Sequence, residues 1–209
     1  MKQIVLALDT SQGTSVAVLI DGKLAAEVSD PNTMRHAENI GTLIAKCVEQ
    51  AGIKSAEVTD VAVGIGPGPF TGLRVGIAAA KMFAAGSKAN LHGIGSLDAI
   101  AFELDLAEPT LVIADARRSE VYYGLFQGKS ESGIPKKLLA PGVSKQAELE
   151  SRLQSENQAY QLVSKPVSAA SIGLLALAMI EEGVPAGPLQ ANYLREPDAT
   201  YAKAKKVTG

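Results

Sequence analysis

The glycine-rich segment at residues 64–86, GIGPGPFTGLRVGIAAAKMFAAG, is the part of the sequence best suited to bind an anion. Glycines ahead of a helix can offer backbone N–H donors, and the positive end of the helix dipole, to a phosphate. Two details argue against a nucleotide cradle. Thr71 stands where a dinucleotide fingerprint needs glycine, and no Gly-Lys-Ser/Thr sequence follows. Because Pro67 and Pro69 also lack an N–H, we expect a structural turn and a helix capped by Thr71.

The histidines and the candidate nucleophiles do not form a recognisable catalytic set. Ile40 follows His36 by one helical turn, so a histidine pair that could clamp a metal is missing, and His92 has no carboxylate or cysteine nearby in the sequence. We expect His36 to be exposed or to cap its helix. Ser96 lacks the flanking glycines of a nucleophile elbow and is expected to cap a helix, while Cys47 lies on an apolar helix face. The sequence therefore predicts no catalytic residue, metal ligand or cofactor-binding residue.

Two similar series of elements position these residues. Each series begins with three strands. In the first series these strands form an antiparallel meander, with turns at Gln12-Gly13 and Asp21-Gly22. The first series is expected as strands over 3–8, 15–20 and 24–28, a helix over 32–51, a strand over 60–65, the glycine loop with its helix, a strand near 91–94 and a helix over 96–106. The second is expected as strands over 110–115, 120–126 and 136–140, a helix from 144, a strand over 160–163 and a helix over 168–182.

This repetition indicates an α/β protein with the actin-like ATPase fold (ASKHA, ribonuclease H-like), built from two similar βββαβα halves. We expect an N-terminal domain at residues 1–104, which holds the GPGPFTG loop, and a smaller C-terminal domain at residues 105–209. Active kinases of this fold need glycine-rich phosphate turns after two aspartates. The turn after Asp9 could serve, but the turn after Asp115 contains no glycine. We therefore expect no ATP turnover, and the fold alone implies no activity.

Five segments of the chain resemble the TsaB (YeaZ) family. They are IVLALDTS near the start, GPGPFTGLRVGIAAAKMFA, SLDA at residues 96–99, DARRSEVYY at 115–123 and NYLR at 192–195. The resemblance covers nearly the whole chain. It implies a role in making threonylcarbamoyladenosine at the adenosine beside the anticodon of ANN-decoding tRNAs. It also implies a non-catalytic partner of the metal-containing transferase TsaD, joined by the ATPase TsaE, so that tRNA is contacted through the complex.

By the same resemblance, the first two long helices form the surface that meets TsaD. We assign this interface to small residues four positions apart and to apolar residues on both helices: Leu43, Ile44, Gly72, Gly76, Ala80, Met82 and Phe83. Packing of the small-residue strip against the chain's own sheet is the alternative. Gly76→Leu is expected to weaken TsaD binding and to leave the monomer folded. Without TsaD, the same apolar surface is expected to form a homodimer.

Composition restricts the remaining functions. The chain has 209 residues, 46% of them hydrophobic, and a net charge of -2, which does not favour nucleic-acid binding by bulk charge. One cysteine excludes an internal disulfide, and the apolar stretch in MKQIVLALDTS is too short to span a membrane. We expect a soluble, cytoplasmic protein with no membrane contact. Two other functions remain as alternatives, a small-molecule kinase of the same fold and a glycoprotease-like peptidase.

Overall fold

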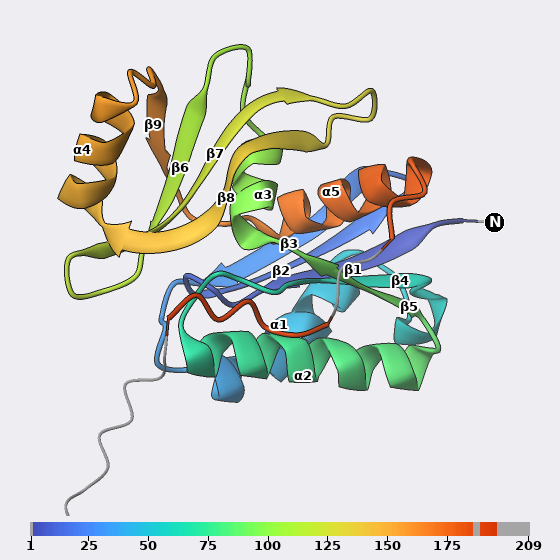
Figure 1. Ribbon diagram of the computed structural model, residues 1–209. Helices are drawn as coiled ribbons and strands as arrows, with labels where there is room; N and C mark the ends of the chain where they lie inside the picture. The colour runs from blue at the N-terminus through green and yellow to red at the C-terminus, as the bar shows by residue number, and fades with distance from the viewer. Residues whose placement is uncertain (1, 186–188, 196–209) are drawn as a thin grey trace, which may run out of the picture.

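The computed structural model describes residues 2–185 and 189–195 (Figure 1). The last part of the expected C-terminal domain, residues 196–209, lies outside them. The strands are β1 (Ile4–Asp9), β2 (Thr14–Ile20), β3 (Lys23–Asp30), β4 (Asp60–Gly64), β5 (Asn90–Ile94), β6 (Thr110–Asp115), β7 (Glu120–Lys129), β8 (Pro135–Lys145) and β9 (Gln161–Ser164). The helices are α1 (His36–Gln50), α2 (Phe70–Ser87), α3 (Ser96–Phe102), α4 (Gln146–Ser155) and α5 (Ala169–Glu181), with a 3-10 turn η1 (Ser55–Glu57).

The first sheet has the strand order β3-β2-β1-β4-β5. Its first three strands form the predicted antiparallel meander, and β4 and β5 extend the sheet in parallel. The turn between β2 and β3 consists of Asp21 and Gly22, which both have positive φ. This backbone geometry matches the twist of a two-residue hairpin. All residues of β1 and β4 are buried, because helices cover both faces of the sheet.

The second sheet repeats this arrangement with the order β8-β7-β6-β9. β6 pairs with β7 in antiparallel and with β9 in parallel, as β1 pairs with β2 and β4. The α/β class and the repeated halves predicted from the sequence are therefore confirmed. β8 is longer than the strand expected near residues 136–140, and its pairing with β7 shifts register at three places. These irregularities explain why its sequence pattern is weak.

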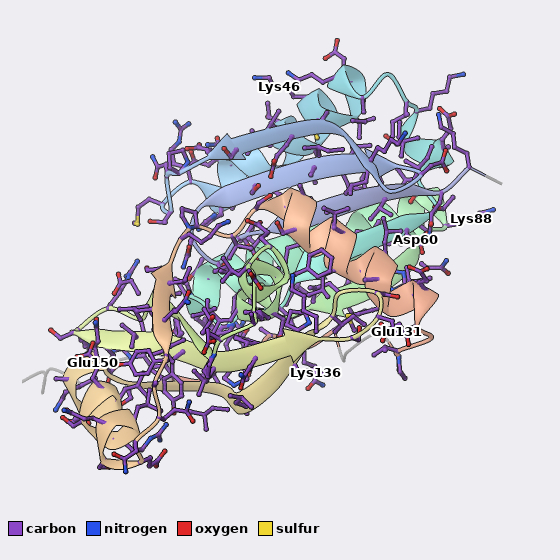
Figure 2. The ribbon with its side chains drawn as sticks, turned by 90° about the horizontal axis from the view of Figure 1, so that it is seen from above. Lys46, Asp60, Lys88, Glu131, Lys136 and Glu150 are labelled. Atoms are coloured by element: carbon purple, nitrogen blue, oxygen red, sulfur yellow. The ribbon has the colours of Figure 1, made fainter. Side chains whose placement is uncertain are left out.

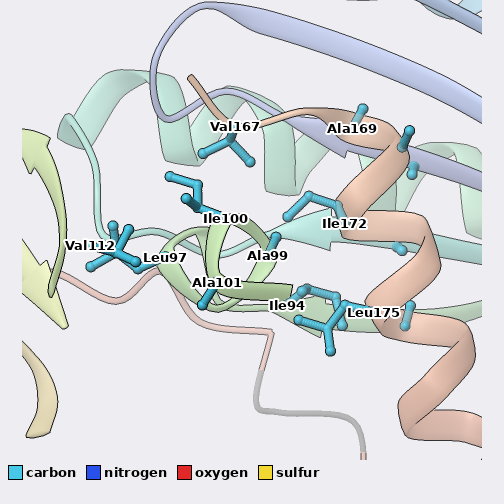
Figure 3. Packing of buried hydrophobic residues seen from close by; sticks show 14 of the residues in the cluster. Ile94, Leu97, Ala99, Ile100, Ala101, Val112, Val167, Ala169, Ile172 and Leu175 are labelled. Atoms are coloured by element: carbon cyan, nitrogen blue, oxygen red, sulfur yellow. The ribbon is translucent and has the colours of Figure 1, made fainter. Parts of the chain in front are cut away.

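The helices divide into an outer layer and a central layer. α1 and α2 cover the outer face of the first sheet, whereas α3 and α5 lie between the two sheets (Figure 1). Figure 3 shows Leu97 and Ile100 of α3 close to Ile172 of α5 and Val112 of β6. All four side chains are buried in one hydrophobic cluster that includes residues of both sheets. A single core therefore joins the two halves.

α5 follows the second sheet in the sequence, yet it packs on β1, β2 and β4 of the first. Gly173 permits this close approach, because a Cβ there would lie 2.3 Å from Cδ1 of Leu19. The start of the helix is anchored as well, since the N–H of Ala169 donates to Oγ of Ser15 at 3.1 Å. The division of the chain after residue 104 stays a prediction, and α5 makes its main contacts across that boundary.

Three residues expected to begin or cap helices have other roles. α1 begins at His36, and this side chain is buried instead of exposed. α2 has Pro69 as its N-cap, so Thr71 is exposed in the first turn and makes no capping hydrogen bond. α3 starts with Ser96, whose N-cap is Gly95. The expected roles of Thr71 and Ser96 as caps are therefore wrong, because both helices begin earlier in the chain than the sequence pattern suggests.

Cys47 is fully buried in the core beneath α1, as predicted, with Sγ 3.5 Å from the carbonyl oxygens of Val16 and Ala26. Burial raises the pKa of the thiol to about 11. Because the thiolate is the reactive form, we expect iodoacetamide at neutral pH to label Cys47 only after unfolding in urea. An Ala147→Cys variant, with a second thiol on an exposed position of α4, supplies a fast-reacting control. Equal labelling rates for both thiols in the native variant would contradict the prediction.

Candidate functional site

The turn between β1 and β2 is organised around the carboxylate of Asp9, which is 2% exposed. Its Oδ1 accepts hydrogen bonds from the N–H of Ser11 at 2.8 Å and from the Ser11 hydroxyl at 2.6 Å. Its Oδ2 accepts one from the Ser96 hydroxyl at 2.8 Å. Burial raises the pKa of Asp9, although the three hydrogen bonds act in the opposite direction. The carboxyl group thus ties the turn to the start of α3.

Gly64, at the end of β4, closes another side of this carboxyl group. A Cβ at position 64 would lie 1.9 Å from Oδ2 of Asp9, so a larger residue does not fit. An aspartate that served a kinase here would have to face hydrated Mg²⁺. Asp9 instead faces protein donors on both oxygens. Among residues 2–185 and 189–195, no three histidine, cysteine or acidic side chains are grouped so that they could hold a metal.

The small-residue strip of α2 faces the β1–β2 turn and not the exterior. The hydroxyl of Thr10 donates to the carbonyl oxygen of Gly72 at 2.8 Å. A Cβ at Gly72 would lie 2.4 Å from the carbonyl oxygen of Thr10, and one at Gly76 would lie 2.3 Å from its Oγ1. Ala80 is also fully buried. The assignment of Gly72, Gly76 and Ala80 to a partner surface is therefore wrong, and Gly76→Leu would disturb the monomer itself.

The four apolar residues assigned to the same interface differ in exposure. Ile44 is buried, and Leu43 and Phe83 are partly buried against the core between the helices and the first sheet. Met82 is 75% exposed. Ile44 thus belongs to the core, while Met82 is the one of the four that is largely accessible. Contact of Leu43, Met82 or Phe83 with a partner stays a prediction.

Small residues accompany Met82 on the outer side of the two helices. Gly41 and Ala45 of α1 and Ala78 of α2 are exposed. α1 and α2 pack against each other on one side of the first sheet, so their exposed sides face away from it together (Figure 1). We call Gly41, Ala45, Ala78 and Met82 the α1–α2 face. Figure 2 shows Lys46 projecting outward from α1 at the edge of the molecule.

The NYLR segment joins the glycine loop to the turn between β6 and β7. The N–H of Asn192 donates to the carbonyl oxygen of Ile65 at 2.7 Å. Nη1 of Arg195 donates to the carbonyl oxygen of Ala116 at 2.7 Å. Two neighbouring sets of contacts, one around Asp9 and one along NYLR, therefore join the five segments that resemble TsaB. Sequence reasoning identified the segments but not these connections, since the partners lie far apart in the chain.

The two histidines lie at opposite ends of the first sheet. Nδ1 of His36 lies 2.8 Å from Oγ1 of Thr14, near the end of β1, and burial lowers the pKa of this histidine. Its expected exposed or capping role is wrong. Nε2 of His92 lies 2.9 Å from Oδ1 of Asp60, at the start of β4. Burial would raise the pKa of Asp60, but hydrogen bonds from His92 and its neighbours lower it. No pattern in the sequence indicates this pair, because its two residues lie on neighbouring parallel strands that are far apart in the chain.

Known proteins share the sequence pattern and the fold of this chain. Residues 31–165 match the family model described as TsaD, tRNA N6-adenosine threonylcarbamoyltransferase. The tRNA threonylcarbamoyladenosine biosynthesis proteins TsaB of Haemophilus influenzae and Escherichia coli are 37% and 31% identical over 56% and 62% of this chain. YeaZ from Pseudomonas aeruginosa superimposes with a TM-score of 0.74 at 23% identity, covering 92% of this chain and 100% of its own. The chain belongs to the TsaB/YeaZ family.

The similarity does not extend over the whole length of every relative. The matched part spans 51% and 57% of the two TsaB proteins, and 56% of a Mycobacterium leprae protein that is 33% identical. An uncharacterized protein of Mycobacterium tuberculosis is 31% identical over 93% of both chains. The likeness to YeaZ confirms the actin-like fold class. In the part of the chain that the structure describes, no helix combines the length and the apolar character needed to cross a membrane.

The close approach of α2 to Thr10 can be tested with two alanine substitutions in one helix. We expect Gly76→Ala to lower the free energy of unfolding by about 1–3 kcal/mol, because the new methyl group collides with the Thr10 side chain. Gly86→Ala is the control, since no atom lies within 4 Å of a Cβ at that position. Alanine favours the helix there and should stabilise by up to about 1 kcal/mol. Urea unfolding curves in which both variants gain stability would contradict the close contact.

The raised pKa of Asp9 predicts a pH dependence of stability. Its folded-state pKa lies above the unfolded value, so its contribution is fully present below about pH 4 and is lost as the pH rises toward the folded-state pKa. Asp9→Asn cannot ionise. We therefore expect the unfolding free energy of this variant to rise relative to the unsubstituted protein as the pH increases above about 4. Asp9→Ala should be less stable throughout, because Ser11 and Ser96 lose their acceptor. A difference between Asp9→Asn and the unsubstituted protein that is independent of pH would contradict the assignment.

Proposed function

We propose that this protein takes part in threonylcarbamoyladenosine biosynthesis on tRNA, as a non-catalytic partner of TsaD that TsaE joins in a ternary complex. The observation that carries the proposal is membership of the TsaB/YeaZ family, whose relatives in Haemophilus influenzae and Escherichia coli are tRNA threonylcarbamoyladenosine biosynthesis proteins. The protein would act in the cytoplasm, and tRNA would be contacted through the complex.

The surroundings of Asp9 support a role without catalysis. A kinase of the actin-like fold needs the aspartate at the end of its first strand to be accessible to a metal–phosphate ligand. The carboxyl group of Asp9 accepts three hydrogen bonds from Ser11 and Ser96, and Gly64 lies against it. Opening this carboxylate to a ligand would leave buried hydroxyl groups without partners. This arrangement stabilises the fold. The geometry therefore favours recognition of a protein partner over catalysis.

The α1–α2 face is the surface that we assign to TsaD. Gly41, Ala45 and Ala78 have small side chains, so a partner helix can approach the backbone closely. Met82 is unbranched and exposed, and such a side chain adapts to the shape of its partner. The exposed side of α2 contains no acidic residue, so apolar contact there does not bury a carboxylate. Because the same features suit a second copy of the chain, we expect a homodimer in the absence of TsaD.

Reconstitution tests the function directly. Unmodified tRNA is incubated with TsaD, TsaE and the threonylcarbamoyl-adenylate synthase, with and without this protein, and threonylcarbamoyladenosine is measured in the digested tRNA. We expect the product to depend on this protein. Equal product in its absence would contradict the partner role. Product formed from this protein and the synthase without TsaD would contradict the non-catalytic role.

The position of the docking surface can be tested with a matched pair of substitutions. Ala78→Glu places a charge in the middle of the α1–α2 face, where its burial against a partner is costly. We expect at least about tenfold weaker binding to TsaD, with unchanged thermal stability. Ala147→Glu makes the same change at an exposed position of α4, on the second sheet and away from α1 and α2 (Figure 1). Equal affinity of the two variants would remove the α1–α2 face from the interface.

A further inference from the structure

The exposed side of α2 carries charge of one sign. Arg74 and Lys81 lie two turns apart on it, and Lys88 follows as the C-cap residue. This spacing of seven residues places the three side chains near one line along the helix, and we call them the basic stripe. Within residues 2–185 and 189–195, α2 is the only helix whose charged residues are all basic, since each of the other four contains a carboxylate. The whole chain has a net charge of -2, so the stripe opposes the sign of the remainder.

The protein does not neutralise the two lysines of the stripe by itself. In the part of the chain that the structure describes, five other cations form ion pairs with carboxylates: Arg35, Lys137, Lys145, Lys165 and Arg195. Lys81 and Lys88 form none among these residues. Glu57 shares a shallow hollow with Lys88, but its Oε2 accepts a hydrogen bond from the N–H of Lys54 at 2.7 Å. Lys88 points outward at the edge of the molecule (Figure 2).

Arg74 is held in place at the other end of the stripe. Its guanidinium lies 3.7 Å from the ring centroid of Phe70, and its Nε donates to the hydroxyl oxygen of Tyr193 at 3.0 Å. The two rings also contact each other, with centroids 4.7 Å apart. The two terminal nitrogens still offer N–H donors that can bind a carboxylate. Because the side chain is already ordered, little conformational entropy is lost when it pairs with a partner.

Apolar and small side chains separate these cations. Ala78, Met82 and Ala85 are exposed on the same side of α2, and Met82 is 75% exposed. Contact of a partner protein with Ala78 and Met82 would also remove water from Lys81, which lies between them in the sequence. Burial of an ammonium group without a counter-charge is costly. A protein that covers this side of α2 therefore has to supply carboxylates next to the basic stripe.

Two other occupants fit this surface less well. A phosphate backbone is bound by many cations and polar donors, and the residues between the three cations of the stripe offer neither. A second copy of the chain presents the same stripe, so a symmetric contact through α2 brings like charges toward each other. An acidic protein surface meets neither difficulty.

From these observations we infer that the α1–α2 face selects its partner by charge. It fits a protein that places carboxylates opposite Arg74 and Lys81, and the same two cations oppose the pairing of two copies of this chain. The inference rests on the function proposed above, which makes TsaD the acidic partner. Salt then has opposite effects on the two complexes, because the Debye length shrinks from about 30 Å in 10 mM salt to about 3 Å in 1 M salt.

Stopped-flow association of the full chain with TsaD tests the attraction. We expect association to be at least about fivefold faster in 10 mM than in 1 M NaCl. In 10 mM NaCl, Lys81→Gln should associate about twofold and Lys81→Glu at least about fivefold more slowly than the unsubstituted protein. In 1 M NaCl the three rates should agree within about twofold. Lys136→Glu is the control, since it makes the same change of net charge at an exposed position of β8 (Figure 2) and should keep the unsubstituted rate.

Analytical ultracentrifugation without TsaD tests the repulsion. We expect the homodimer to be at least about fivefold tighter in 1 M than in 10 mM NaCl. Lys81→Gln should dimerise more tightly than the unsubstituted protein in 10 mM NaCl, whereas Lys136→Gln should not. A dimer that weakens as NaCl is added, or no dimer even in 1 M NaCl, would contradict repulsion between the two stripes.

The attraction fails if the Lys81 variants and the unsubstituted protein associate with TsaD at one rate in 10 mM NaCl. It also fails if Lys81→Glu abolishes binding of tRNA to the isolated chain and leaves the TsaD rate unchanged, since the stripe would then serve RNA. These outcomes differ from failure of the proposed function. In that case TsaD does not bind at any salt concentration, or tRNA is modified equally well without this protein.

Discussion

The buried carboxyl group of Asp9 is the constraint on which the first half of the molecule depends. A buried carboxylate without hydrogen-bond donors is costly, so Ser11 and Ser96 both have to reach it. Residue 64 of β4 has to be glycine, because a side chain there would collide with the carboxylate. Thr10, the residue after Asp9, then sets how close α2 can come to the turn. One polar group therefore determines the relative positions of three elements. Apolar packing of the surrounding sheet and helices supplies the stability that makes its burial possible.

Local patterns in the sequence were sufficient for the elements and their order. Asp21-Gly22 specified a hairpin because its backbone geometry is local, and the apolar spacing around Cys47 specified which side of α1 is buried. Local patterns do not show, however, which neighbour packs on a given helix face. A smooth helix face with Gly72 and Gly76 looks the same whether a loop or another protein approaches it. The environment of His36 likewise depends on Thr14, which only the tertiary structure brings near.

The two similar halves differ in what covers their sheets. In the first sheet both faces are protected, by α1 and α2 on one side and by α5 on the other. The second sheet has α3 against one face, while Leu149 and Leu153 of α4 pack on the other face against β6 and β7, and its strand β9 is mostly exposed. A pocket at the start of α2 lies where the two halves meet, and both contribute to its wall. Close packing is thus concentrated around the β1–β2 turn, and space is left beside it.

The position of α5 has a consequence for how the chain folds during synthesis. The first sheet is made from residues 4–94, but one of its faces stays uncovered until α5 has formed, and the glycine loop lacks its partner until Asn192 arrives. An uncovered face of β1 and β2 presents apolar side chains to water. The oldest part of the nascent chain therefore completes its core last. In this molecule the second sheet is topologically an insertion, and the first sheet cannot complete its packing until α5 and Asn192 have been synthesised.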